Sequence, residues 1–255
     1  MTGAIERRLA GFPKTRPPLS PKLAAIYARQ YAENRSGGST AASLSQRLER
    51  WMHRQVAADV ADGTPRATLE LGAGTLNQLP FEPAGGVYDV VEPFHELYAG
   101  SPLRDRLRDV FDDIADVPSD RRYARITSIA AMEHVCDLPV LLARAARLME
   151  PGGSFRAAIP SEGGLLWRLG WTLTTGLEFR MRHGLDYGEL MAHEHVNDAA
   201  EIEALIRALF ETVAVRTFGL GRQLSLYRFV AARNPRLDVA EAWLARFRSE
   251  GSKAR

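Results

Sequence analysis

The chain has 255 residues, a quarter of them charged, and a formal net charge of +2. This length suffices for one well-buried α/β domain with extensions, and the small net charge gives no argument for a nucleic-acid partner. The chain has no run of about 18 apolar residues, so we expect no integral membrane segment. The only cysteine is Cys136, which excludes an internal disulfide and favours a cytoplasmic location.

The N-terminal part is predicted to be an arm followed by two helices. Residues 1–20 are rich in proline and basic side chains, and we expect them to be irregular. A basic arm could contact an anionic substrate or a membrane surface, or it could be a solvated tail. Apolar residues at helical spacing predict helices at 21–34 and 43–62, with Ser39 or Thr40 as a cap for the second.

Strands and helices then alternate. Short apolar runs predict strands, and helical spacing predicts helices near 94–100 and 139–149. This alternation favours an α/β fold with a Rossmann-like, doubly wound and mostly parallel sheet. The expected strands are 67–72, 87–92, 106–111, 124–130 and 153–160.

In the last third of the chain, an insert interrupts the alternation of strands and helices before the final strands of the sheet. Residues 161–197 carry glycines, tryptophans and arginines, and we interpret them as an inserted lid. A helix is expected at 198–210. Strands at 211–218 and 224–232, joined by a glycine-rich turn, predict a C-terminal antiparallel hairpin.

We divide the chain into three parts. Residues 1–62 are the arm and helices that cover the rest, and residues 63–235 form the main domain with its insert at about 161–197. Residues 236–255 are expected to form a C-terminal helix, near 238–249, and a tail.

The run Thr-Leu-Glu-Leu-Gly-Ala-Gly-Thr at 68–75 is the most informative motif. A strand leads into Gly72 and Gly74, where the missing Cβ lets the backbone turn tightly and approach a ligand. A second strand, about 20 residues later, ends in Glu92, whose carboxylate can accept hydrogen bonds from both hydroxyls of a ribose. Glu70, beside the turn, suits a ligand that carries an ammonium group.

A ribose together with an ammonium group describes S-adenosylmethionine better than a nicotinamide dinucleotide. The dinucleotide fingerprint needs a third glycine, and Asn77 stands at that position. Three later segments follow in a recognisable order: acids after the third strand (111–118), Glu-His-Val after the fourth (133–135), and a Pro-Gly-Gly stop before the fifth (151–153).

With this ordered set of motifs, residues 66–160 resemble a class I S-adenosylmethionine-dependent methyltransferase of the type-11-like, small-molecule branch. The resemblance implies S-adenosylmethionine as the cofactor. Leu76 stands where the family has a further glycine, so we expect the first helix to start differently and to be short. The cofactor-binding residues that the resemblance implies are Glu70, Gly72 and Gly74 for the methionine part, Glu92 for the ribose, and Asp113 and Ile114 for the adenine.

Three histidines are candidate general bases for a substrate hydroxyl: His134 after the fourth strand, and His193 and His195 in the insert. Each could instead be a structural residue. We predict no metal site, because Ala130 replaces the first acid with which some family members hold a divalent ion. His193-Glu-His195 also lacks a third ligand at a familiar spacing.

Three residues of the insert are candidates for substrate binding. Trp167 could stack on a ring, and Arg180 and Arg182 could bind an anionic group. Tryptophans so placed more often pack in a core or a lid, and arginines on a polar helix face are common.

The predicted function is methyl transfer to a small molecule, with oxygen as the expected acceptor in a sugar or secondary metabolite. The alternatives are a Rossmann oxidoreductase, a non-catalytic S-adenosylmethionine-binding protein, and a methyltransferase with a macromolecular acceptor. The modest net charge argues against RNA as that acceptor.

Overall fold

The fold is described from a computed structural model, which places residues 3–34, 43–172 and 176–253. Side chains are described outside residues 28–46, 171 and 250–255. The expected caps Ser39 and Thr40 lie outside the described residues. Within them, no helix is long and apolar enough to cross a membrane.

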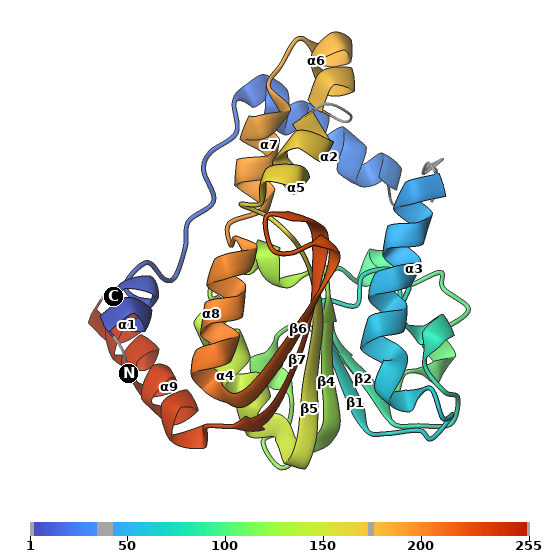
Figure 1. Cartoon of the computed structure of the whole chain (residues 1–255), viewed down its shortest axis with the longest axis vertical. Helices are drawn as coiled ribbons and strands as arrows, with labels where there is room; N and C mark the ends of the chain where they lie inside the picture. The colour runs from blue at the N-terminus through green and yellow to red at the C-terminus, as the bar shows by residue number, and fades with distance from the viewer. Residues whose placement is uncertain (1–2, 35–42, 173–175, 254–255) are drawn as a thin grey trace.

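The centre is a seven-stranded sheet in the order β3-β2-β1-β4-β5-β7-β6 (Figure 1). The first five strands run parallel, and β7 and β6 add to the β5 edge in antiparallel pairing, which confirms the predicted fold class. The strands are β1 (Thr68–Leu71), β2 (Tyr88–Val91), β3 (Val110–Phe111), β4 (Tyr123–Ile129), β5 (Met149–Pro160), β6 (Phe210–Leu220) and β7 (Leu224–Pro235).

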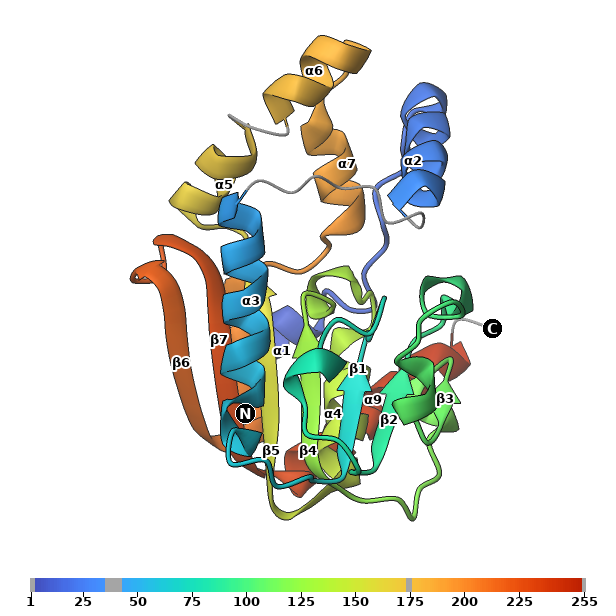
Figure 2. The ribbon, with the colours of Figure 1, turned by 90° about the vertical axis from the view of Figure 1, so that its right-hand side faces the viewer.

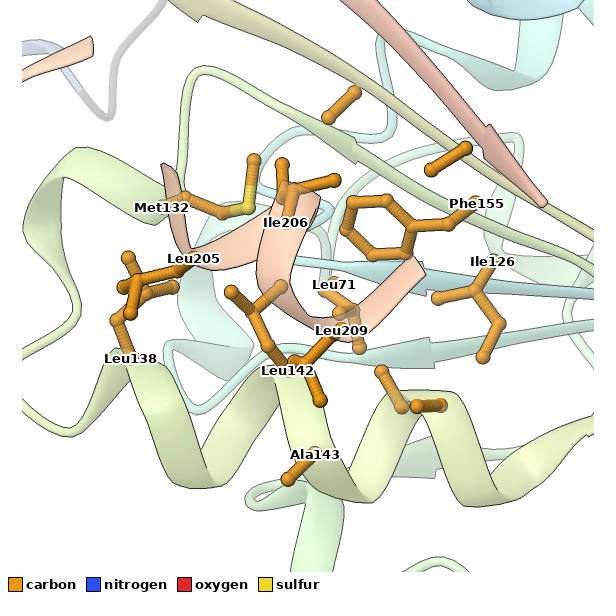
Figure 3. Close-up of a cluster of buried hydrophobic side chains, with 14 of the residues drawn as sticks. Leu71, Ile126, Met132, Leu138, Leu142, Ala143, Phe155, Leu205, Ile206 and Leu209 are labelled. Carbon is orange, nitrogen blue, oxygen red and sulfur yellow. The ribbon is translucent and has the colours of Figure 1, made fainter. Parts of the chain in front are cut away.

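One face of the sheet carries the main hydrophobic core. Leucines and alanines spaced three and four apart on α4 (Leu138–Leu148) and α8 (Ala199–Leu209) turn inward, toward residues such as Ile126 and Phe155 of the strands. Figure 3 shows Leu142, Ile206 and Leu209 meeting Leu71 and Phe155 in this layer. All four residues of β1 are buried, because both faces of the central strands are covered.

The other face is covered by the N-terminal helix α3 (Ser43–Ala57). Its Met52 and Val56 pack with Ala158 and Phe229 of the sheet. A fully buried ion pair secures the end of this segment, since the Arg125 guanidinium on β4 bonds Asp59, Glu82 and the Val56 carbonyl oxygen.

The described connections that follow the first three strands in the chain are short and contain no α-helix. The segments after β1, β2 and β3 contain turns and the 3-10 helices η2 (Leu79–Phe81), η3 (His95–Leu97), η4 (Arg104–Arg106) and η5 (Ile114–Asp116). The predicted helix at 94–100 is therefore wrong in type and length, and the short helix expected after β1 is not α-helical. Pro80 and Pro83 explain the latter, because proline removes a helical hydrogen-bond donor.

The N-terminal arm is part of the fold. Residues Gly3–Leu9 form α1, whose Ile5 and Leu9 are buried in the main core, so the prediction of an irregular segment over 1–20 is wrong for its first half. Farther along the arm, Lys14 bonds the Val196 carbonyl oxygen and pairs with Glu201. The arm is therefore not a solvated tail.

The insert contains α5 (Leu165–Trp171), α6 (Leu177–His183) and α7 (Tyr187–Glu194), which lie with α2 (Pro21–Asn34) above the carboxyl ends of the parallel strands (Figures 1 and 2). A small core joins α2, α6 and α7, formed by Leu23, Ile26, Phe179 and Leu190. This cap bounds the region where ligands bind in open α/β sheets.

The C-terminal helix α9 (Leu237–Lys253) packs against α4, and its Trp243 is fully buried in the main core. We expect Trp243→Ala to lower the free energy of unfolding by about 3–5 kcal/mol, because it leaves a large cavity in that core. Leu237→Ala, an exposed change on the same helix, should alter it by less than about 0.5 kcal/mol. Urea unfolding measures both, and equal effects of the two substitutions would contradict the packing of α9.

Candidate functional site

The glycine turn after β1 is held against the end of β4. Gly72 has φ +73°, and a Cβ atom placed on it would lie 2.4 Å from the Cβ atom of Ala131. Gly74 also adopts a left-handed conformation, at φ +51°. Leu76 has φ +66° and is fully buried, so the position where the family has a glycine keeps a glycine-like backbone with a leucine in place.

A cavity of about 640 Å³ opens beside this turn, at the carboxyl ends of β1, β2 and β4. Its walls combine glycines and apolar side chains with a few polar groups. The lining includes Gly72, Gly74, Glu92, Phe94, Leu97, Val135, His134, Glu194, Arg16 and Tyr27.

Glu92 lies at the end of β2, and its carboxylate joins two loops at this cavity. One oxygen accepts from the Gly74 N–H at 2.8 Å and the other from the Phe94 N–H at 3.0 Å. Each carboxylate oxygen can accept more than one hydrogen bond, so capacity for ribose hydroxyls remains. The position predicted to bind the ribose thus fits that role.

A second cavity, of about 350 Å³, shares Gly72, Gly74 and Ala130 with the first and contains Glu70. Glu70 accepts a hydrogen bond from the Tyr88 hydroxyl at 2.8 Å, and burial raises the pKa of Glu70 to about 8. An ammonium group nearby would favour the charged carboxylate. The two cavities share part of their lining, which suits a ligand that bears an adenosine at one end and an amino group at the other.

Asp113 and Ile114 lie outside the lining of both cavities. The Asp113 carboxylate caps η5 by accepting from the Ala115 N–H at 2.7 Å, and Ile114 is buried in the main core. Their contact with adenine stays a prediction. The apolar side chains that line the larger cavity include Phe94, Leu97 and Val135, which lie in or beside the short 3-10 helices after β2 and β4, where the sequence has no periodic pattern to mark them.

His134 lies in η6 (Met132–His134), directly after β4, and lines the larger cavity. Its Nδ1 is 2.9 Å from the carbonyl oxygen of Glu194. A carbonyl can only accept, so Nδ1 carries the hydrogen and the neutral ring presents Nε2 as a lone pair. Burial and the nearby His195 lower the pKa of His134, which keeps this ring neutral.

The pKa of His195 shifts in the opposite direction. Burial pulls the pKa of His195 down, but the Glu162 carboxylate bonded to its Nδ1 outweighs this, and the net shift is upward. The two imidazoles meet edge to face, with ring centroids 4.7 Å apart. The two rings also differ in place, since His134 lines the larger cavity and His195 lines neither cavity.

A third ionisable group completes this cluster. Glu133 is buried, which raises the pKa of its carboxyl to about 7, and its Oε1 is 3.9 Å from Nε2 of His134. Trp167 donates from Nε1 to Glu162 at 3.2 Å and packs edge-on against Tyr227. Trp167 therefore lies behind the histidine pair.

Arg16 of the N-terminal arm holds this cluster together. Its guanidinium donates to the carbonyl oxygens of His134 and His193 at 2.8 Å and of Glu194 at 3.1 Å. Asn197, fully buried, adds bonds to the carbonyl oxygens of Met132 and Val135. In the sequence, Arg16 is recognisable only as part of a basic arm, because its partners are backbone atoms 118 to 178 residues away.

The remaining candidates lie apart from the cavities. His193 bonds the Pro17 carbonyl oxygen through Nδ1 at 2.7 Å and anchors the arm, so a structural role accounts for it. Arg180 and Arg182 are exposed on α6 and line neither cavity. Their roles in catalysis and substrate binding stay predictions. Within the described ranges, no group of three or more His, Cys, Asp or Glu side chains could hold a metal ion.

A family model described as "Methyltransferase domain" matches residues 40–209. No curated protein matches the chain. Among solved structures, the plantazolicin methyltransferase BpumL, in complex with a substrate analogue and SAH, is similar with a TM-score of 0.60 at 13% identity, over 91% of this chain and 100% of that chain.

Two further solved structures show the same likeness. A possible histamine N-methyltransferase from Thermotoga maritima gives a TM-score of 0.51 at 15% identity, over 72% of this chain and 90% of that one. Magnesium protoporphyrin IX methyltransferase from Synechocystis PCC 6803, with bound SAM, gives 0.50 at 14% identity, over 86% and 100%. At these identities the likeness concerns the fold, and it agrees with the Rossmann-like sheet described above.

The contact between the turns after β1 and β4 can be tested by substituting two glycines that share a left-handed backbone conformation. Gly72→Ala should lower the free energy of unfolding by about 2–4 kcal/mol, through left-handed strain and the overlap with Ala131. Gly63 has φ +79°, but no atom lies within 4 Å of the Cβ that alanine would add. Gly63→Ala should therefore lower the free energy of unfolding by only about 1–2 kcal/mol. Denaturant unfolding measures the free energy of unfolding of both variants. Equal decreases in the two would contradict the close approach of the turns after β1 and β4.

Proposed function

Because the chain belongs to the methyltransferase-domain family and is an S-adenosylmethionine-dependent enzyme, we propose that it methylates an oxygen atom of a small molecule bound beside His134. The nucleotide-dependent oxidoreductase considered from the sequence belongs to a different family, and that alternative falls. The observation that carries the choice of oxygen is the bond from His134 Nδ1 to the Glu194 carbonyl oxygen.

The cofactor contributes a methyl group activated by the positive charge of its sulfur. In our proposal, Glu92 holds the ribose hydroxyls, and the apolar wall of Phe94, Leu97 and Val135 receives the adenine. Glu70 would face the amino group and become charged there, because a neighbouring cation lowers the pKa of a carboxyl. Gly72 and Gly74 line both cavities, so the glycine turn lies next to each of these regions.

His134 supplies what an oxygen acceptor needs. A hydroxyl must lose its proton as the new bond to carbon forms, and a neutral imidazole with a lone pair at Nε2 can take that proton. The imidazolium that results would be stabilised by the Glu194 carboxylate, 3.5 Å from Nδ1, and by Glu133. A carbon or amine acceptor would need less help from a base, which is why this arrangement favours oxygen.

The cap supports the same proposal by enclosing the acceptor. Arg16 and Tyr27 line the cavity from the N-terminal segment, and Glu194 lines it from α7. Exclusion of water and orientation of the two reactants can supply roughly 7–11 kcal/mol of the barrier reduction in favourable cases. Arg16 would act as a positioning residue, since it bonds the carbonyl oxygen that orients the His134 ring.

Removal of the ribose acid should weaken cofactor binding. We expect Glu92→Ala to reduce the affinity for S-adenosylmethionine by about 1.5–3 kcal/mol, the usual value of hydrogen bonds to a charged group. Calorimetric titration measures this, with Glu211→Ala on the exposed edge strand β6 as the matched control. An unchanged affinity in a folded Glu92→Ala protein would reject the assignment of this residue.

Removal of the base should reduce turnover while cofactor binding persists. We expect His134→Gln to lower kcat by about 10²–10⁴-fold in a methyl-transfer assay over a panel of sugars and phenolic metabolites. The exposed His95→Gln serves as the control.

The pH profile identifies the group. In the unaltered protein, kcat/KM should rise with pH as His134 loses its proton, with a midpoint below the ordinary pKa of 6.5, and His134→Gln should remove this limb. A variant that keeps the same limb and the same kcat would exclude His134 as the base. Turnover with no oxygen acceptor but with a carbon or amine acceptor would overturn the choice of oxygen.

A further inference from the structure

The insert and the β6–β7 hairpin carry an unusual concentration of exposed apolar side chains. Among the described residues, nine large hydrophobic side chains are exposed, and six of them lie in these two segments; Met181 is 74% exposed and Leu220 is 82% exposed. Monomeric proteins rarely expose large apolar groups together unless the surface contacts something. We call this set the lid patch: Leu165, Leu169, Leu177, Met181, Leu220 and Leu224.

The lid patch lies on three neighbouring segments. On α5, Leu165 and Leu169 are four residues apart and share one side of the helix, as do Leu177 and Met181 on α6. The Leu166 N–H donates to the Gln223 carbonyl oxygen at 3.1 Å, which fixes α5 to the β6–β7 turn. Figures 1 and 2 both place α5 between this turn and α6, at one end of the molecule.

Arginines accompany the apolar groups on each of these segments. Arg168 precedes Leu169, Arg180 and Arg182 flank Met181, and Arg222 lies in the turn between Leu220 and Leu224. All four side chains are exposed, and Arg222 also pairs with Glu203. Over residues 165–183, Glu178 is the single acid beside three arginines, so this stretch carries a net positive charge.

We propose that the lid patch docks the protein on an anionic lipid surface. Leucine and methionine tips bordered by arginines suit the boundary between acyl chains and charged headgroups, where apolar burial and attraction to anionic lipid add together. Basic charge along all three segments matches phosphate-bearing headgroups. The peripheral contact requires no membrane-spanning helix, and it does not depend on the identity of the methyl acceptor.

The test is flotation of the full chain with vesicles of phosphatidylcholine alone and of phosphatidylcholine mixed with phosphatidylglycerol. The protein should float with the mixed vesicles, and high salt should weaken the binding because it screens the arginines. A double substitution, Met181→Ser with Leu220→Ser, should reduce the partition coefficient at least about tenfold, given the apolar area that each side chain buries. Arg180→Gln with Arg182→Gln should reduce binding to the mixed vesicles alone.

Leu237→Ser on α9 is the matched control, since Leu237 is exposed but belongs to a different part of the molecule. It should bind like the unaltered chain. All variants should keep their melting temperature, because these positions are exposed, and this check separates docking from folding.

Three outcomes would overturn the proposal: no flotation with mixed vesicles, equal flotation of the lid-patch variants and the Leu237→Ser control, or a change in oligomeric state in place of a change in lipid binding. The last result, measured by analytical ultracentrifugation, would make the lid patch a protein contact. Methyl transfer to a soluble acceptor is assayed separately, so failure of docking leaves the proposed reaction intact.

Discussion

The close approach of two turns, after β1 and after β4, is the constraint on which the site depends. A Cβ atom on Gly72 would lie 2.4 Å from the Cβ atom of Ala131, so glycine is what allows the two turns to touch. That contact brings Glu92, bonded to the Gly74 N–H, and His134, three residues after Ala131, to the walls of one cavity. The positions of Glu92 and His134 at this cavity therefore depend on one backbone contact.

The N-terminal segment covers a face of the sheet that crossover helices cover in other open sheets. The connections after β1, β2 and β3 contain 3-10 turns, and α3 covers the exposed face of the sheet, where the buried Arg125 pairs with Asp59 and Glu82. Breaking such a buried pair leaves an uncompensated charge, so this link is strongly specified once formed. The same segment brings Arg16 to the cavity, where its guanidinium donates to the His134 carbonyl oxygen, so the segment that covers the sheet also holds the backbone of His134.

The charge states around His134 follow from their surroundings. His134 donates to a backbone carbonyl and is held neutral by burial, whereas its neighbour His195 is held by the Glu162 carboxylate. Two similar rings 4.7 Å apart thus differ in their tendency to bind a proton. Such a separation of pKa values between adjacent groups is common where one of them transfers protons.

The sequence by itself determined the sheet, its mostly parallel order, the glycine turn and Glu92, because these depend on local patterns: apolar runs, glycines that follow a strand, and an acid at a strand end. It also placed His134 after the fourth strand, but it could not separate that histidine from His193 and His195. Only the tertiary structure gives the three histidines different surroundings: His134 bonds the Glu194 carbonyl oxygen, His195 bonds the Glu162 carboxylate and His193 bonds the Pro17 carbonyl oxygen, all across large separations in the chain. For the same reason the helix Gly3–Leu9 and the buried Trp243 could not be assigned from local spacing, because their partners are helices far away in the sequence.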